Sequence, residues 1–86
     1  MKKSDNIEEF SGPRWKEKTF ADSSLIEKIK YDYLMQTLFV KFKNKESKYS
    51  FFDVPVEVAN NLFESKSVGK YFHEFIKGKY NHHKQG

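Results

Sequence analysis

The apolar residues of this chain change their spacing at Pro55, and this change constrains the fold more than any other feature. Before Pro55 they alternate with polar residues, most clearly over residues 37–43, where Leu38, Val40 and Phe42 share one side. Such alternation is typical of an antiparallel strand with one buried face. After Pro55 the apolar residues recur every three or four positions, as in amphipathic helices. The sequence therefore predicts strands first and helices second.

Three strands are predicted before Pro55, over residues 25–31, 37–43 and 48–53. Ile26 is out of phase with the later apolar residues of the first strand, which predicts a bulge or a late strand start. The connections between the three segments are short and polar, so we expect an antiparallel meander.

Two helices are predicted after the strands. Pro55 suits the first position of a helix over residues 55–64, because its missing N–H would be unpaired there. Ser67 is a natural N-cap for a second helix, which Gly78 ends. A three-stranded meander leaves its apolar face in water unless the helices cover it. The expected fold class is α+β: a three-stranded antiparallel meander followed by a C-terminal pair of helices (βββαα).

A chain of 86 residues holds one small domain at most. Residues 1–22 lack sustained periodicity and are expected to form a partly flexible N-terminal extension. Trp15 and Phe20 in this extension either dock on the domain or belong to a disordered tail. Residues 23–80 form the expected folded domain, and residues 81–86 form a polar tail.

Several short stretches of the expected domain match one known family in order and spacing. They are residues 23–24, 29–32, 38–42, 49–51, 54–55, 67–72 and 76–80. Residues 23–80 resemble the KTSC domain, a small module also found at the C-terminus of some lysyl-tRNA synthetases. The family's central Tyr-x-Tyr is here Tyr49-Ser50-Phe51, which lacks the second hydroxyl. The resemblance implies RNA, such as a tRNA-like RNA, as the partner.

The excess of basic residues lies at the end of the chain. The 16 Lys and Arg exceed the 12 Asp and Glu by 4. Residues 1–64 have no net charge, whereas residues 65–86 hold five lysines against Glu74 alone. A local basic excess attracts phosphate-bearing partners. The alternative is a solvated segment that keeps the protein soluble.

Four residues at the start of the second predicted helix could bind an anion: Lys66, Ser67, Gly69 and Lys70. The N–H groups of a first helical turn have no partner within the helix, and Gly69 would let an anion approach the backbone. The alternative is a plain N-cap, with Gly69 present because another element passes close by.

Lys66, Lys70 and Lys77 are spaced to share one side of the same helix, and Lys79 and Tyr80 extend this surface. A lysine row beside a tyrosine suits a nucleic-acid backbone and a stacked base. The alternative is the solvated face of an amphipathic helix.

A third candidate lies in the predicted sheet, where Phe39, Lys41 and Lys43 share one strand face. Aromatic residues on sheets stack bases in several RNA-binding folds. A domain this small needs most of its aromatic residues for the core, however.

The sequence offers no catalytic, cofactor or metal site. Cysteine is absent, and His73, His82 and His83 have no carboxylate or thiol cluster to complete a metal site. No apolar stretch approaches the ~18 residues of a membrane span, and no apolar core follows Lys2 and Lys3 as a signal peptide would require. We expect a cytoplasmic, non-catalytic binding module for RNA or another nucleic acid. The alternative is a protein-interaction module that docks through a sheet edge or through Trp15 and Phe20.

Overall fold

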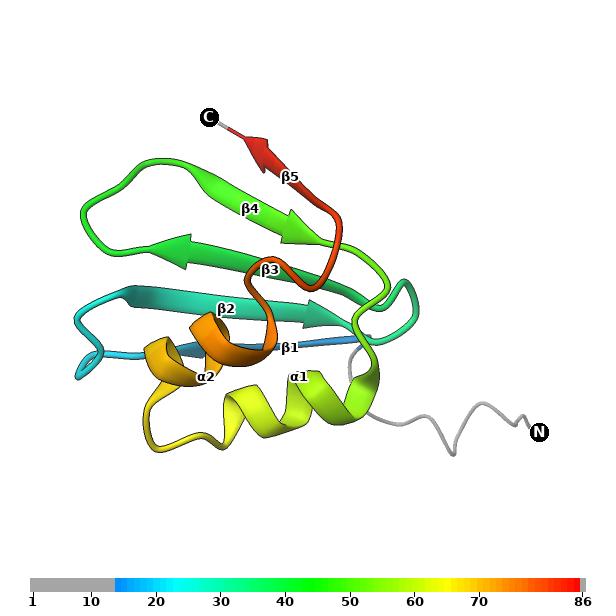
Figure 1. Cartoon of the computed structure of the whole chain (residues 1–86), viewed down its shortest axis with the longest axis horizontal. Helices are drawn as coiled ribbons and strands as arrows, with labels where there is room; N and C mark the ends of the chain where they lie inside the picture. The colour runs from blue at the N-terminus through cyan, green and yellow to red at the C-terminus, as the bar shows by residue number, and fades with distance from the viewer. Residues whose placement is uncertain (1–13, 86) are drawn as a thin grey trace.

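The computed structural model describes residues 14–85, which form one antiparallel sheet and two helices (Figure 1). The sheet contains β1 (Trp15–Thr19), β2 (Ile26–Asp32), β3 (Thr37–Phe42), β4 (Lys48–Phe51) and β5 (His82–Gln85). The helices are α1 (Val56–Phe63) and α2 (Val68–Phe75), which both lie in the connection between β4 and β5.

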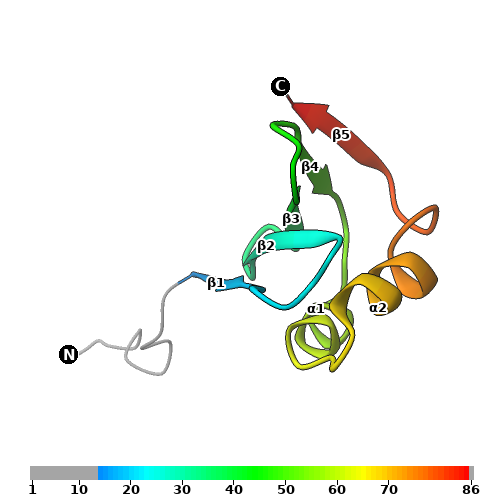
Figure 2. The same ribbon diagram turned by 90° about the vertical axis from the view of Figure 1, so that its left-hand side faces the viewer.

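The strands follow the order β1-β2-β3-β4-β5, and each pair of neighbours is antiparallel. Both helices lie on the same side of the sheet, as Figure 2 shows. The α+β class and the central meander are therefore confirmed. The expected number of three strands is wrong, since the sheet has five.

The two unexpected strands are the edges of the sheet, and every residue in them is exposed. Exposed strands need no alternation of apolar residues, because their backbone hydrogen bonds hold them to the neighbouring strand. β1 occupies part of the expected N-terminal extension, and β5 occupies most of the expected polar tail. Residues 1–13 of that extension and residue 86 lie outside the described part of the chain.

Lysine side chains also attach β1 to the rest of the domain. The Lys18 Nζ donates a hydrogen bond of 2.9 Å to the Phe63 carbonyl at the end of α1. The Lys16 ammonium lies 4.9 Å from the centre of the Phe63 ring. A cation suits this place because the last carbonyls of a helix lack intrahelical donors.

The start of β2 confirms the irregularity predicted at Ile26. The strand begins at Ile26, and its register with β3 shifts between Ile26 and Lys28. Ile26 and Ile29 thereby both point into the core, although their spacing is odd. β4 ends at Phe51, two residues earlier than predicted, and Asp53 has a positive φ of 58°.

Both helices are eight residues long, shorter than the sequence suggested. Pro55 is the N-cap of α1, whereas the sequence predicted it as the first residue of the helix. Ser67 is the N-cap of α2 as predicted, but its side chain makes no capping hydrogen bond. α2 ends at Phe75, and Gly78 follows with a φ of +76°, a conformation that favours glycine.

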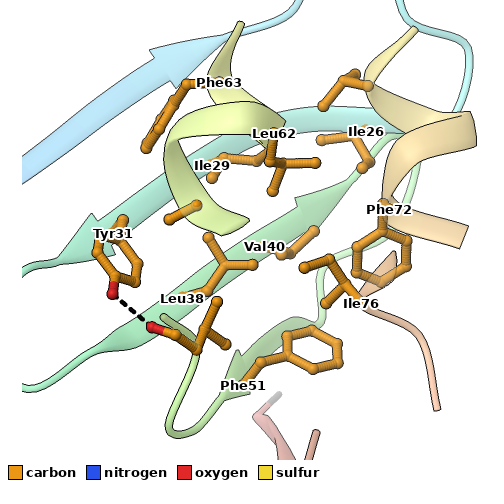
Figure 3. Packing of buried hydrophobic residues seen from close by; sticks show 13 residues of the cluster. Ile26, Ile29, Tyr31, Leu38, Val40, Phe51, Leu62, Phe63, Phe72 and Ile76 are labelled. Atoms are coloured by element: carbon orange, nitrogen blue, oxygen red, sulfur yellow. Dashed lines mark hydrogen bonds between the residues drawn. The ribbon is translucent and has the colours of Figure 1, made fainter. Parts of the chain in front are cut away.

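The core fills the space between the helices and the inner face of β2, β3 and β4 (Figure 3). Tyr31 is completely buried there, and its hydroxyl donates a hydrogen bond of 2.5 Å to the Val54 carbonyl. This bond joins β2 to the segment that leads into α1. The remaining buried apolar residues are Ile26, Ile29, Leu38, Val40, Phe51, Val54, Ala59, Leu62, Phe63, Val68, Phe72 and Ile76.

Candidate functional site

Four of the seven residues proposed from the sequence gather at the beginning of α2. Lys66, Ser67, Gly69 and Lys70 line an open groove of about 720 Å³, opposite the connection between β1 and β2. Lys66, Ser67 and Lys70 are exposed. The groove therefore combines the start of a helix with two cations that solvent can reach, which attract anions, and the carboxylates of Asp22 and Glu74 also line it.

Another segment passes close to Gly69, which is part of the alternative that the sequence left open. A Cβ at this position would lie 3.4 Å from the Leu25 Cβ and 3.5 Å from its Cδ2. The start of β2 thus passes close to the first turn of α2. These distances are ordinary van der Waals contacts, so an alanine would also fit and packing alone does not require glycine here.

The other three proposed residues lie beyond the end of α2. Lys77 follows the C-cap, so Lys66, Lys70 and Lys77 do not form one row along the helix; only Lys70 is inside α2. Lys79 and Tyr80 border a separate depression next to Phe52. Tyr80 is half-buried against the core, so much of its ring is unavailable to a stacked base.

Ion pairs hold two lysines of the sheet, but they hold none of the lysines of residues 65–85 within the described part of the chain. On the sheet, Lys28 forms an ion pair of 2.6 Å with Glu17, and Lys41 forms one of 3.1 Å with Glu27. Within the described part of the chain, none of the later lysines forms an ion pair. The basic excess of this segment therefore stays available to an external anion. These lysines are Lys66, Lys70, Lys77, Lys79 and Lys84.

The third candidate surface from the sequence consisted of Phe39, Lys41 and Lys43. Only part of it lies on the face of the sheet away from the helices. Phe39 and Lys41 lie on this face, but the Lys41 ammonium is bound by Glu27 and by the Lys45 carbonyl. The Lys43 Nζ instead donates to the Ala21 carbonyl at 2.9 Å. Phe39 is half-buried, so this face offers paired charge and little exposed ring.

Sequence reasoning missed a second groove, of about 460 Å³, between α2, the end of β3 and the β4–β5 pair. We call it the aromatic groove. Its ring side chains are Phe42, Tyr49, Phe51, Phe72, His73 and His82, and three lysines line it as well. These rings come from four separate elements, so no local spacing brings them together. The available signal was the large number of aromatic residues, 15 in a chain of 86.

Five of the described titratable groups have shifted pKa values, namely Arg14, Glu17, Lys28, Tyr31 and Asp32, and none of them lines either groove. Burial raises the pKa of the Tyr31 hydroxyl above its usual value. The hydrogen bond from Arg14 lowers the pKa of the Asp32 carboxyl, and that from Lys28 lowers the pKa of Glu17. These shifts follow from core packing and surface ion pairs.

Two further findings concern residues 14–85. No three side chains that could ligate a metal come together among them. His82 and His83 are neighbours on β5, and successive side chains of a strand point to opposite faces. Neither helix in this part of the chain has the length and apolar character needed to cross a membrane.

Comparison with known proteins places residues 22–80 in one family model, described as the KTSC domain. The match begins after β1 and ends before β5. A crystal structure of a KTSC domain protein from Yersinia pestis superposes with a TM-score of 0.76 and 29% identity. That superposition covers 84% of this chain and 99% of the Yersinia chain.

The curated relatives are lysine–tRNA ligases. The ligase of Trichormus variabilis is 39% identical over 61 residues, which is 71% of this chain and 11% of the ligase. The ligase of Nostoc punctiforme is 37% identical over 59 residues, or 69% of this chain and 10% of the ligase. The chain therefore spans about a tenth of the length of the curated relatives that it matches.

Proposed function

This chain belongs to the KTSC domain family, and from this premise we propose that it is a small non-catalytic module that binds RNA. The binding is weak and largely electrostatic. The surface begins at Lys66, Ser67, Gly69 and Lys70 and continues past the end of α2 to Lys77 and Lys79. No cofactor or metal takes part.

One observation carries the proposal: the exposed lysines after residue 64 have no ion pair within the described part of the chain. Ion pairs on the sheet neutralise Lys28 and Lys41 internally. Lysines without a carboxylate partner displace the counterions condensed on the phosphates of a nucleic acid, and the release of these counterions drives the binding. The segment around α2 is therefore the favoured contact with a phosphate backbone.

The curated relatives support RNA as the source of the phosphates. By their names, the matched ligases act on tRNA. The matched segment is only about a tenth of each ligase, so their aminoacylation activity is not part of the proposal. What we transfer to this chain is contact with a tRNA-like RNA.

Fluorescence anisotropy with labelled tRNA at ~50 and ~200 mM salt tests the proposal. We expect affinity to fall steeply with salt. The double variant Lys66→Gln, Lys70→Gln should reduce the slope of log affinity against log salt by about 1.5, since each phosphate contact contributes ~0.7–0.9.

The matched control is Lys28→Gln, Lys48→Gln, which removes the same charge from the opposite face of the sheet. We expect it to bind as the unmodified protein does. Absence of binding at the lower salt would refute the function, and equal losses in the two double variants would refute the mapped surface.

A second candidate function is protein binding through β1. The observation that favours it is the exposure of Trp15, which is 45% accessible on an edge strand. The Lys30 ammonium lies 4.7 Å from the centre of the Trp15 ring. An edge strand has unpaired backbone groups that another chain can extend, and an exposed tryptophan adds contact area.

Trp15→Ala separates the two functions. Under the second function, the variant loses a partner recovered by pull-down while its RNA affinity stays unchanged. Deletion of residues 1–22 is unsuitable, because it removes β1 from the sheet. An unchanged set of partners with Trp15→Ala would count against the second function.

A further inference from the structure

The aromatic groove exists because the helices leave part of the inner sheet face uncovered. His82 pairs with Phe51, and Lys84 pairs with Tyr49, so all four side chains point to the helix side. Phe51 is buried in the core, yet Tyr49 is only half-buried and the two β5 side chains are exposed. A concave, partly apolar surface thus remains open to solvent.

The rings of the groove form one continuous network. The centre of the Phe72 ring lies 5.4 Å from that of Phe42 and 5.5 Å from that of Phe51. The His82 ring lies 5.9 Å from Tyr49 and 5.5 Å from Phe51, at tilts of 42° and 34°. His82 is therefore held over other rings on one side, while it remains exposed.

The charges around the rings are all of one sign. Lys45, Lys77 and Lys84 line the groove, and no carboxylate does. No salt bridge involves these three lysines within the described part of the chain. The volume of about 460 Å³ falls in the range of roughly 300–1,000 Å³ that is usual for small-molecule sites.

A ligand that fits must combine a planar apolar body with negative charge. Bases stack on aromatic rings and phosphates meet lysines, so a nucleotide has both properties. In a duplex the bases are stacked on one another and are not available to the groove. We propose that the aromatic groove binds an unpaired nucleotide of single-stranded RNA, with its base against His82 and Tyr49 and its phosphate near Lys84 and Lys77.

This inference rests on the proposed function and adds a preference for single strands. Electrostatic attraction alone favours a duplex, which carries more phosphates for the same length. Base stacking reverses this order. The groove therefore predicts that a single strand binds more tightly than a duplex of the same length.

The β5 strand supplies matched variants for the test. His82→Ala removes a ring from the groove, whereas His83→Ala removes the same ring from the opposite face. Lys84→Gln and Lys48→Gln form a second pair, on the groove side and on the other face of the sheet. His82, His83, Lys84 and Lys48 are all exposed, so none of the four changes leaves a cavity in the core.

The probe is a labelled oligouridine of about eight nucleotides, compared with a duplex of equal length, since single-strand sites span ~4–16 nucleotides. We expect His82→Ala to weaken oligouridine binding roughly 5- to 100-fold, the range for loss of one base–ring stack. His83→Ala should stay within about twofold of the unmodified protein, and Lys84→Gln should weaken binding more than Lys48→Gln does.

The outcomes separate the groove from the general function. Equal affinities of His82→Ala and His83→Ala, or tighter binding of the duplex, would overturn the groove and leave electrostatic RNA binding in place. Failure of the unmodified protein to bind either RNA at low salt would overturn both. A loss with His82→Ala but none with Lys66→Gln, Lys70→Gln would keep the groove and overturn the surface at the start of α2.

Discussion

Replacement of Tyr31 by phenylalanine isolates one hydroxyl in the core. The Tyr31 side chain is completely buried, and its ring packs edge-on against Tyr33, with the ring centres 4.9 Å apart. Phenylalanine keeps this ring and its packing. The variant loses only the hydrogen bond of 2.5 Å to the Val54 carbonyl.

The expected cost follows from the burial of Val54. That residue is also completely buried, so water cannot replace the lost donor. A buried polar group left without a partner costs about 1–3 kcal/mol of unfolding free energy. In a domain of this size each kcal/mol lowers the melting temperature by ~4–8 °C, so we expect a fall of roughly 5–20 °C.

Urea unfolding followed by far-ultraviolet circular dichroism measures this cost as a lower midpoint with an unchanged slope. The control is Tyr71→Phe, because the Tyr71 hydroxyl has no hydrogen bond among residues 14–85. A loss below about 0.5 kcal/mol for Tyr31→Phe, the usual scale of surface substitutions, would refute the reasoning.

The dependence of stability on alkaline pH is a second test of the same hydroxyl. Burial raises the pKa of Tyr31 in the folded state, whereas an unfolded tyrosine ionises near ~10. The stability that this shift represents is complete below the unfolded pKa and is lost as pH rises through the folded pKa. Tyr31→Phe should therefore lose less stability than the unmodified protein as the pH is raised above ~10.

Two further variants test other parts of the description. Gly69→Ala should raise stability by up to ~1 kcal/mol, because alanine favours the helix and the new methyl meets Leu25 at an ordinary 3.4–3.5 Å; a lower melting temperature would contradict this contact. Asp32→Asn should make the melting temperature depend less on pH in the acid range. The Arg14 guanidinium and the Met35 N–H hold the pKa of Asp32 low, so its contribution is present above the unfolded pKa near ~4 and disappears as pH falls through the folded value. Parallel curves of melting temperature against pH for the two proteins would rule out this role.

The central elements of the fold were predictable because each buries one face. Leu38 and Val40 alternate with half-buried neighbours in β3, and Ala59, Leu62 and Phe63 follow helical spacing in α1. Burial imposes these periods on the sequence. No residue of the edge strands is buried, so β1 and β5 carried no period, and hydrogen bonds to a distant segment decide their structure.

The candidate site was predictable to a similar extent. The lysines at the start of α2 are close in sequence, so counting charges found them. Phe42 was placed on the apolar side of its strand and is half-buried against the core, but the sequence did not show that the inner face extends beyond the helices to β5. His82 in particular was assigned to a polar tail, and only the pairing with β4 brings it beside Phe51.

The position of β5 has a consequence for the order of folding. The other strand pairs join segments separated by short connections, whereas the β4–β5 pair must wait for residues 52–81, which contain both helices. Closing a longer loop costs more entropy, and β5 gains back only four residues of pairing on one side. We therefore expect β5 to dock last during folding and to detach first. Since β5 contributes His82 and Lys84, the aromatic groove is completed only at this final step, and a ligand seated in it would slow the detachment of the strand.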